Sequence, residues 1–170
     1  PARLATDGPD PAMIRLNQSL THALCLADTK ALLDFAAADP AAAEPAGTIG
    51  YCMGGRHAYA AAGTFPDRIA AMASLHGGFQ VTDRPDSAHL LPRHITAECY
   101  FGLADGDPLS PPEHQRAIAE QCREHAIRAR LEVHEGAHHG FTFPTRFCYD
   151  KPAAERVWER VFALFRRNLG

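Results

Sequence analysis

A chain of 170 residues, 46% of them apolar, is long enough for one domain with a hydrophobic core and short for two. Its formal net charge of −3 leaves no excess of lysine and arginine to neutralise phosphates, which argues against nucleic acid and anionic membranes as partners. No apolar run approaches the roughly 20 residues that span a bilayer. We therefore expect a single domain over residues 1–170 and no membrane association.

The five cysteines are odd in number and show no CxxC spacing. The sequence thus indicates neither a disulfide framework nor a cysteine-rich zinc site. Because thiols stay reduced in the cytoplasm, we expect a cytoplasmic protein. The chain begins at Pro1 rather than at a methionine, and we expect it to be part of a longer polypeptide.

Helices and strands are predicted to alternate along the chain. An apolar stripe of Leu20, Leu24 and Phe35 predicts a helix over 18–38, which Asp39 and Pro40 end. A strand over 46–51, a small-residue helix to about 63, a buried strand over 69–76 and a polar loop over 80–94 follow.

Further along, a strand is predicted over 95–102. Ser110 is the expected N-cap of the next helix, with Pro111 at its first position. A strand over 128–136 and a final helix with apolar residues from Val157 to Phe165 complete the chain.

Strands that alternate with helices predict an α/β fold, with a parallel sheet covered by helices on both faces. In such sheets, ligands bind beyond the carboxyl ends of the strands. Polar side chains follow each predicted strand there: Cys52, then His76, then Asp105 and Asp107, then His138 and His139.

The stretch GYCMGG places Cys52 between Gly50 and Gly54, where a strand gives way to a helix. A nucleophile on such a sharp turn needs small neighbours two residues away on either side. The first N–H groups of the helix favour a thiolate, and the Met53 N–H can face a developing oxyanion. The alternative is a buried cysteine that packs as a small hydrophobe.

A cysteine hydrolase needs a base and a group that orients it, and here two aspartates and two histidines compete for these roles. A metal site of His134, His138 and His139 is a weaker alternative. Arg56, in the first turn of the helix after Cys52, is expected to form a structural ion pair, with a substrate clamp as the alternative.

Four segments, GYCMGG, YFGLADGDPLSPPE, EGAHHGFTFP and YDKPAAERVWERVFALFRRNL, resemble the dienelactone hydrolase family, α/β hydrolases with a Cys-Asp-His triad. The resemblance runs from about residue 18 to the end. It implies that Cys52 is the nucleophile. In the family pattern, a proline four residues after the acid selects Asp107, and a small residue and then Phe after the histidine select His139.

Two departures from the family pattern bear on function. The dienelactone enzymes carry an arginine four residues after the catalytic histidine that holds the substrate carboxylate, and this chain has Phe143 there. By resemblance, this favours a less polar ester or lactone. The family also has strands before the helix at 18–38. We expect this chain to be the C-terminal two thirds of the family domain. It would then lack the second oxyanion-hole N–H, which an early loop supplies in the family. It would also lack a glutamate that acts on the thiol in the dienelactone enzymes.

The sequence therefore predicts a cysteine-dependent hydrolase of carboxylic esters or lactones, acting through an acyl-thioester on a small-molecule substrate, with no metal or organic cofactor. The residues expected to contact the substrate are His76, Tyr51, Phe141 and Phe143. The alternative is a catalytically impaired, hydrolase-like binding or subunit module, because a lost oxyanion donor slows catalysis roughly 10² to 10³-fold. A redox-sensing thiol is a weaker alternative, and a homo-oligomer is left open.

Overall fold

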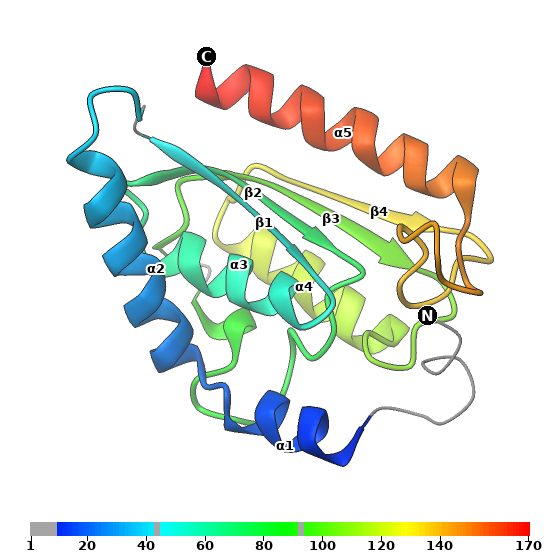
Figure 1. The fold of residues 1–170 in the computed structure, drawn as a ribbon. Coiled ribbons are helices and arrows are strands. Elements are labelled where there is room, and N and C mark those ends of the chain that lie inside the picture. The colour runs from blue at the N-terminus through cyan, green and yellow to red at the C-terminus, as the bar shows by residue number, and fades with distance from the viewer. Residues whose placement is uncertain (1–9, 43–44, 92–93) are drawn as a thin grey trace.

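The computed structural model describes residues 10–42, 45–91 and 94–170. Its centre is a sheet of four parallel strands in the order β1-β2-β3-β4 (Figure 1). The strands are β1 (Ala46–Tyr51), β2 (Ile69–Leu75), β3 (Glu98–Ala104) and β4 (Ala129–His134). All four end at the same edge of the sheet, so the polar residues that follow them are brought together.

Helices cover both faces of the sheet, as predicted (Figure 1). On one face lie α2 (His22–Ala37), α3 (Met53–Thr64) and α4 (Pro112–Glu124), and on the other lies α5 (Lys151–Leu169). Helix α1 (Pro11–Ser19) precedes α2, and a short 3-10 helix, η2, spans Ala88–Leu90. Within the described parts of the chain, no helix is both long and apolar enough to traverse a bilayer.

Each face of the sheet has its own hydrophobic core, because successive strand residues point to opposite sides. Met72, Phe101 and Leu103 pack toward α3 and α4, whereas Leu75 and Tyr100 pack toward α5. Small side chains fill much of α3, where Ala58, Ala60, Ala61 and Ala62 are all buried. This lets the helix that follows Cys52 lie close to β1 and β2.

The helix expected over 18–38 begins at His22, after an N-cap at Thr21 whose side chain accepts a hydrogen bond from the Leu24 N–H. The preceding α1 was not predicted, although Asp10 followed by Pro11 is a regular helix start.

The apolar stripe that was expected to be buried in α2 lies on the exposed face of this helix. Leu24 and Phe35 are exposed, whereas Leu33 is buried. Leu26 packs against the core shared with α3 and α4. This helix carries apolar residues on two faces, so its periodicity could not decide which face is buried.

The start of α4 also differs from the prediction. The N-cap position is Pro111 rather than Ser110, and no side chain caps it. Gln115 instead donates hydrogen bonds from its side-chain amide to the carbonyls of Ser110 and Ala104, at 2.8 and 3.1 Å. These bonds tie the first turn of α4 to the end of β3.

Candidate active site

Cys52 occupies a strained turn between β1 and α3. Its backbone has φ 52° and ψ −120°, outside the ordinary regions for a residue with a side chain. The Cys52 N–H donates to the Leu75 carbonyl at 3.1 Å, and its own carbonyl accepts from Gly55 and Gly78 at 3.0 and 3.1 Å. Backbone bonds from three segments therefore hold the conformation that presents the thiol.

The glycines around Cys52 are not equivalent. A Cβ atom at Gly50 would lie 2.0 Å from the carbonyl oxygen of Gly54, and one at Gly55 would lie 2.5 Å from Oγ of Ser74. At Gly54 a Cβ atom would meet no atom of the described residues within 4 Å. The expectation that the turn needs a small residue on both sides of Cys52 is therefore correct for Gly50 and wrong for Gly54. The second crowded position is Gly55, which packs against β2.

Asp107 and His139 meet beside this turn, although 32 residues separate them. Oδ2 of Asp107 lies 2.7 Å from Nδ1 of His139, and Oδ1 of Asp107 accepts from the Leu109 N–H at 2.8 Å. The Asp107 side chain is fully buried and that of His139 is 17% exposed. A buried carboxylate at Nδ1 fixes the imidazole with Nε2 free for a second partner.

The second partner of the imidazole is the Cys52 thiol. The Nε2 atom is buried and makes no hydrogen bond of regular geometry to any described residue, but it is close enough to act on the thiol. His139 lowers the pKa of Cys52, and this outweighs the opposing effect of burial, with further help from the Met53 N–H. These interactions favour the thiolate.

The pKa of the His139 imidazole is shifted in the opposite direction, upward. Burial disfavours its charged form, but the hydrogen bond with Asp107 and the interaction with the Cys52 thiol outweigh burial and raise the pKa of His139 to about 9. The lowered thiol pKa and the raised imidazole pKa both favour a thiolate–imidazolium pair.

The competing candidates lie elsewhere. Asp105 is exposed and accepts only a long hydrogen bond, at 3.5 Å, from the Gly136 N–H. His138 is exposed, and His134 is buried against Tyr100 and Phe141. Within the described residues, no three His, Cys, Asp or Glu side chains are grouped to hold a metal ion.

The four residues expected to contact substrate fall into two pairs. Tyr51 and Phe143 are half-buried, with ring centroids 5.3 Å apart. His76 and Phe141 are fully buried and present no surface to a ligand in this structure. His76 stacks edge-on against His139 at 5.3 Å and shares a 2.8 Å hydrogen bond with Thr142.

Some neighbours of the site carry no sequence signal. Thr142 shares a hydrogen bond with His76 from a loop 66 residues further along the chain, and no sequence motif predicts this contact. Gly78 is better signalled, because Gly77 and Gly78 directly follow His76 after β2. A Cβ atom at Gly78 would lie 3.2 Å from Leu109 and 3.6 Å from Cε1 of His139. Gly78 therefore lets the chain pass closely beside the imidazole.

A parallel sheet covered on both faces, with polar residues at the carboxyl ends of the strands, is the architecture of doubly wound α/β folds, which include the α/β hydrolases. The model of the dienelactone hydrolase family matches residues 6–169. The chain therefore belongs to the dienelactone hydrolase family.

Among curated proteins, the chain is similar to a candidate carboxymethylenebutenolidase from Synechocystis sp. The two are 28% identical over 162 residues, which cover 91% of this chain and 64% of the relative. A candidate 2-oxo-3-(5-oxofuran-2-ylidene)propanoate lactonase from Bradyrhizobium sp. is 26% identical over 131 residues, covering 75% and 52%. The chain thus spans less than two thirds of the length of these relatives.

Solved structures share the fold. A candidate dienelactone hydrolase from Klebsiella pneumoniae superposes with a TM-score of 0.81 at 22% identity, covering 88% of this chain and 63% of that one. A dienelactone hydrolase-like promiscuous phosphotriesterase from metagenomic libraries gives a TM-score of 0.75 at 24% identity, covering 87% and 63%. At these identities the likeness concerns the fold alone.

Proposed function

We propose that this protein is a cysteine-dependent hydrolase of carboxylic esters or lactones, with Cys52 as nucleophile, His139 as base and Asp107 as the group that orients the base. The observation that carries the proposal is the bond of 2.7 Å between Asp107 and His139 beside a thiol presented on a strained turn. Family membership supports the same reaction class.

In the first half of the reaction, the Cys52 thiolate adds to the substrate carbonyl carbon and the carbonyl oxygen becomes an oxyanion. The Met53 N–H, at the start of α3, stabilises this charge. The tetrahedral intermediate then collapses, the bond to the leaving oxygen breaks, and protonated His139 gives its proton to that oxygen. The product is an acyl-thioester on Cys52; the alcohol is released when the substrate is an ester and stays attached to the acyl chain when the substrate is a lactone.

In the second half, neutral His139 takes a proton from water, and the hydroxide adds to the thioester carbonyl. The C–S bond breaks, which releases the acid and restores the thiolate beside the imidazolium. Asp107 holds the imidazole in one tautomer throughout and stabilises its charged form. Every proton that His139 accepts is thus returned within one turnover.

The proposal is tested with a panel of p-nitrophenyl esters, lactones and thioesters. We expect Cys52→Ala to lower kcat/KM by at least about a thousandfold, because removing a nucleophile removes the whole covalent route. Cys25→Ala is the matched control, since burial raises the pKa of that half-buried thiol. Iodoacetamide should label Cys52 before the other four cysteines. Equal turnover by the wild type and Cys52→Ala would reject the nucleophile, and no turnover by either would favour a binding module.

A further inference from the structure

A hollow of about 600 Å³ lies on the α5 side of the sheet, between the last two strands and that helix. β4 is an edge strand, so the hollow lies at the side of the molecule (Figure 1). Among the described residues, its charged lining consists of four arginines and one glutamate, namely Arg128, Arg130, Arg160, Arg167 and Glu98. The net charge of −3 for the whole chain therefore conceals a local excess of positive charge.

This arginine-lined hollow is remote from the candidate active site. Glu98 begins β3 and Arg128 directly precedes β4, so the hollow lies toward the amino ends of these strands. Cys52 instead follows the carboxyl end of β1, at the opposite end of the parallel sheet. A ligand in the hollow would therefore be distinct from the substrate of the proposed hydrolase.

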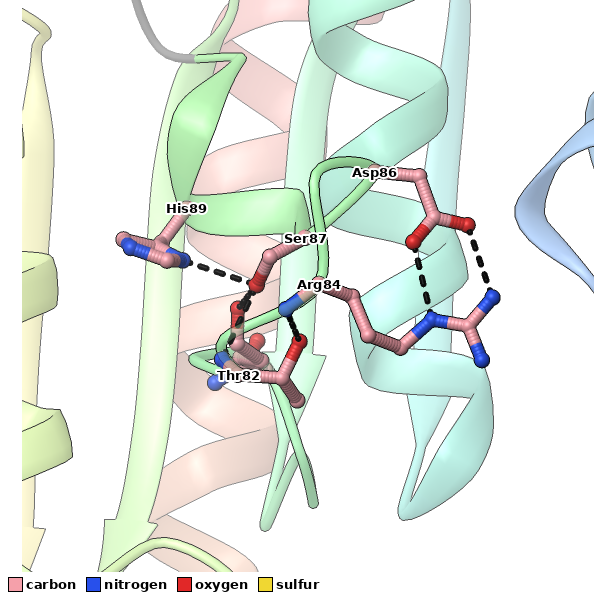
Figure 2. Close-up of polar contacts among 6 residues, drawn as sticks. Thr82, Arg84, Asp86, Ser87 and His89 are labelled. Atoms are coloured by element: carbon pink, nitrogen blue, oxygen red, sulfur yellow. Dashed lines mark hydrogen bonds and ion pairs between the residues drawn. The ribbon is translucent and has the colours of Figure 1, made fainter.

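Two arginines of the molecule form balanced ion pairs and serve for comparison. In the loop after β2, Arg84 binds Asp86, with Nε–Oδ1 and Nη2–Oδ2 distances of 2.9 and 3.3 Å (Figure 2). In the hollow, Arg167 binds Glu98 in a similar way, with Nη2 2.6 Å from Oε1. In both pairs one carboxylate neutralises one guanidinium.

The arginines around Glu132 are not balanced in this way. Oε2 of Glu132 lies 3.4 Å from Nε of Arg130 and 3.3 Å from Nε of Arg160. Arg156 binds the other oxygen of the same carboxylate. One negative charge thus faces three positive charges. Like charges held this close repel one another, and a further anion would relieve the repulsion.

Arg128 adds a guanidinium that no carboxylate neutralises. None of the described carboxylates lies within ion-pair distance of it. Its backbone carbonyl accepts a hydrogen bond from the Cys99 N–H at 2.8 Å, which fixes the chain at the start of β4. Arg128 and Arg130 are two residues apart along an extended segment, so their side chains point to the same face.

The arginines of the hollow also keep hydrogen-bond donors that the described part of the protein does not use. Arg130 and Arg160 approach Glu132 through Nε, and their Nη atoms donate to no described residue. Each guanidinium carries five N–H donors in a rigid, planar fork. Donors from both β4 and α5 can therefore converge on one anion.

These donors suit phosphate better than carboxylate. A carboxylate offers two oxygens in one plane, whereas a phosphate group offers three oxygens that point away from one another. Guanidinium groups on two different elements can reach such oxygens from separate directions. The excess of several positive charges favours an anion with more than one negative charge, and the hollow has the volume of a site for a small molecule.

We propose that this hollow binds a diphosphate group, as free pyrophosphate or as part of a nucleotide, and that Arg128, Arg130 and Arg160 hold it. The site does not depend on the chemistry of Cys52, and it stands or falls separately from the proposed hydrolase function. Arg128 is the most direct residue to change, because it is exposed and its removal breaks no ion pair within the described residues.

Isothermal titration calorimetry of the protein with inorganic pyrophosphate at low ionic strength tests the proposal. We expect saturable binding of one pyrophosphate per chain. Arg128→Gln and Arg130→Gln should each raise Kd about three- to fivefold, since each removes an exposed, charge-assisted contact. Arg128→Lys should keep part of the affinity, because lysine retains the charge but not the planar fork. Arg123→Gln removes an exposed charge on α4 and is the charge-matched control.

Two further titrations define the place and the ligand. Cys52→Ala should bind pyrophosphate with an unchanged Kd, and a loss of binding there would place the anion at the active site and overturn the proposal. ADP that binds at least as tightly as pyrophosphate would assign the diphosphate to a nucleotide, and weaker binding would assign it to the free anion; both results support the site. Absence of saturable pyrophosphate binding would overturn it, as would equal changes of Kd in Arg123→Gln and Arg128→Gln.

Discussion

At the residue scale, the proposed chemistry depends on two titrating groups that influence each other, Cys52 and His139. The Cys52 pKa is lowered mainly by His139, and the His139 pKa is raised to about 9 by Asp107 and Cys52 against the effect of burial. Each residue therefore contributes to the pKa shift of the other, with Asp107 as the main cause of the shift at His139. A thiolate that owes its charge to one imidazole should lose it when that imidazole is removed.

We therefore predict that His139→Ala moves the pH profile of Cys52 alkylation to higher pH and lowers the rate at pH 7 severalfold. The measurement is the rate of iodoacetamide labelling between pH 5 and 10, followed by mass spectrometry. His138→Ala is the control, because that neighbouring imidazole is exposed. An identical profile in wild type and His139→Ala would mean that the thiol does not depend on this histidine.

Family resemblance selected Asp107 and His139 from two aspartates and two histidines, and the structure joins these two by a hydrogen bond. It could not reveal that His76 is fully buried against His139, because burial depends on Thr142, Phe141 and Phe143 from a distant loop.

At the scale of elements, the junction of β1 and α3 is set by close backbone contacts. A side chain at Gly50 would collide with backbone atoms of Gly54 and Gly55, which cannot move without unwinding the first turn of α3. The open space around Gly54 predicts the opposite behaviour at that position.

We predict that Gly50→Ala lowers the free energy of unfolding by about 3 kcal/mol or more, at the upper end of the range for overpacking. Gly54→Ala should change it by at most about 1 kcal/mol and in the stabilising direction, because alanine is favoured over glycine within a helix. Urea denaturation of both variants checks this difference. Equal losses would show that the turn is not held as the structure describes.

Helix α5 is held to the sheet by charge as well as by its apolar face. Arg156 and Arg160 both bind Glu132 of β4, and Arg167 binds Glu98 of β3. The arginines outweigh the effect of burial and lower the pKa of Glu132 to about 2. These partners could not be paired from sequence, since the contacts join strands and helix that are 24 to 69 residues apart.

At the scale of the whole molecule, the fully buried His76 and the half-buried His57 should influence how stability responds to acid. Burial lowers the pKa of both His57 and His76 to about 4, from an ordinary value of 6.5. The folded state therefore takes up these protons less readily than the unfolded state. Their contribution to stability is complete above pH 6.5 and is lost as pH falls from 6.5 through about 4.

We predict that the free energy of unfolding falls between pH 6.5 and 4.5, with each histidine contributing at most about 1.4 kcal/mol per pH unit. His57→Phe keeps an aromatic ring against His22 but removes one titrating group. It should therefore reduce this slope by the contribution of one histidine. His138→Asn, on the surface, should leave the slope unchanged. Urea denaturation at several pH values measures it, and a flat profile in the wild type would contradict the assigned burial.

The amino-acid sequence by itself determined the alternation of strands and helices, the family and the turn at Cys52, because periodicity and backbone sterics act over a few residues. Only the tertiary structure decided which face of α2 is buried, that Gly55 rather than Gly54 is crowded, and that Arg56 forms no ion pair with a carboxylate of the described residues. Burial and charge pairing depend on segments that meet only when the chain has folded.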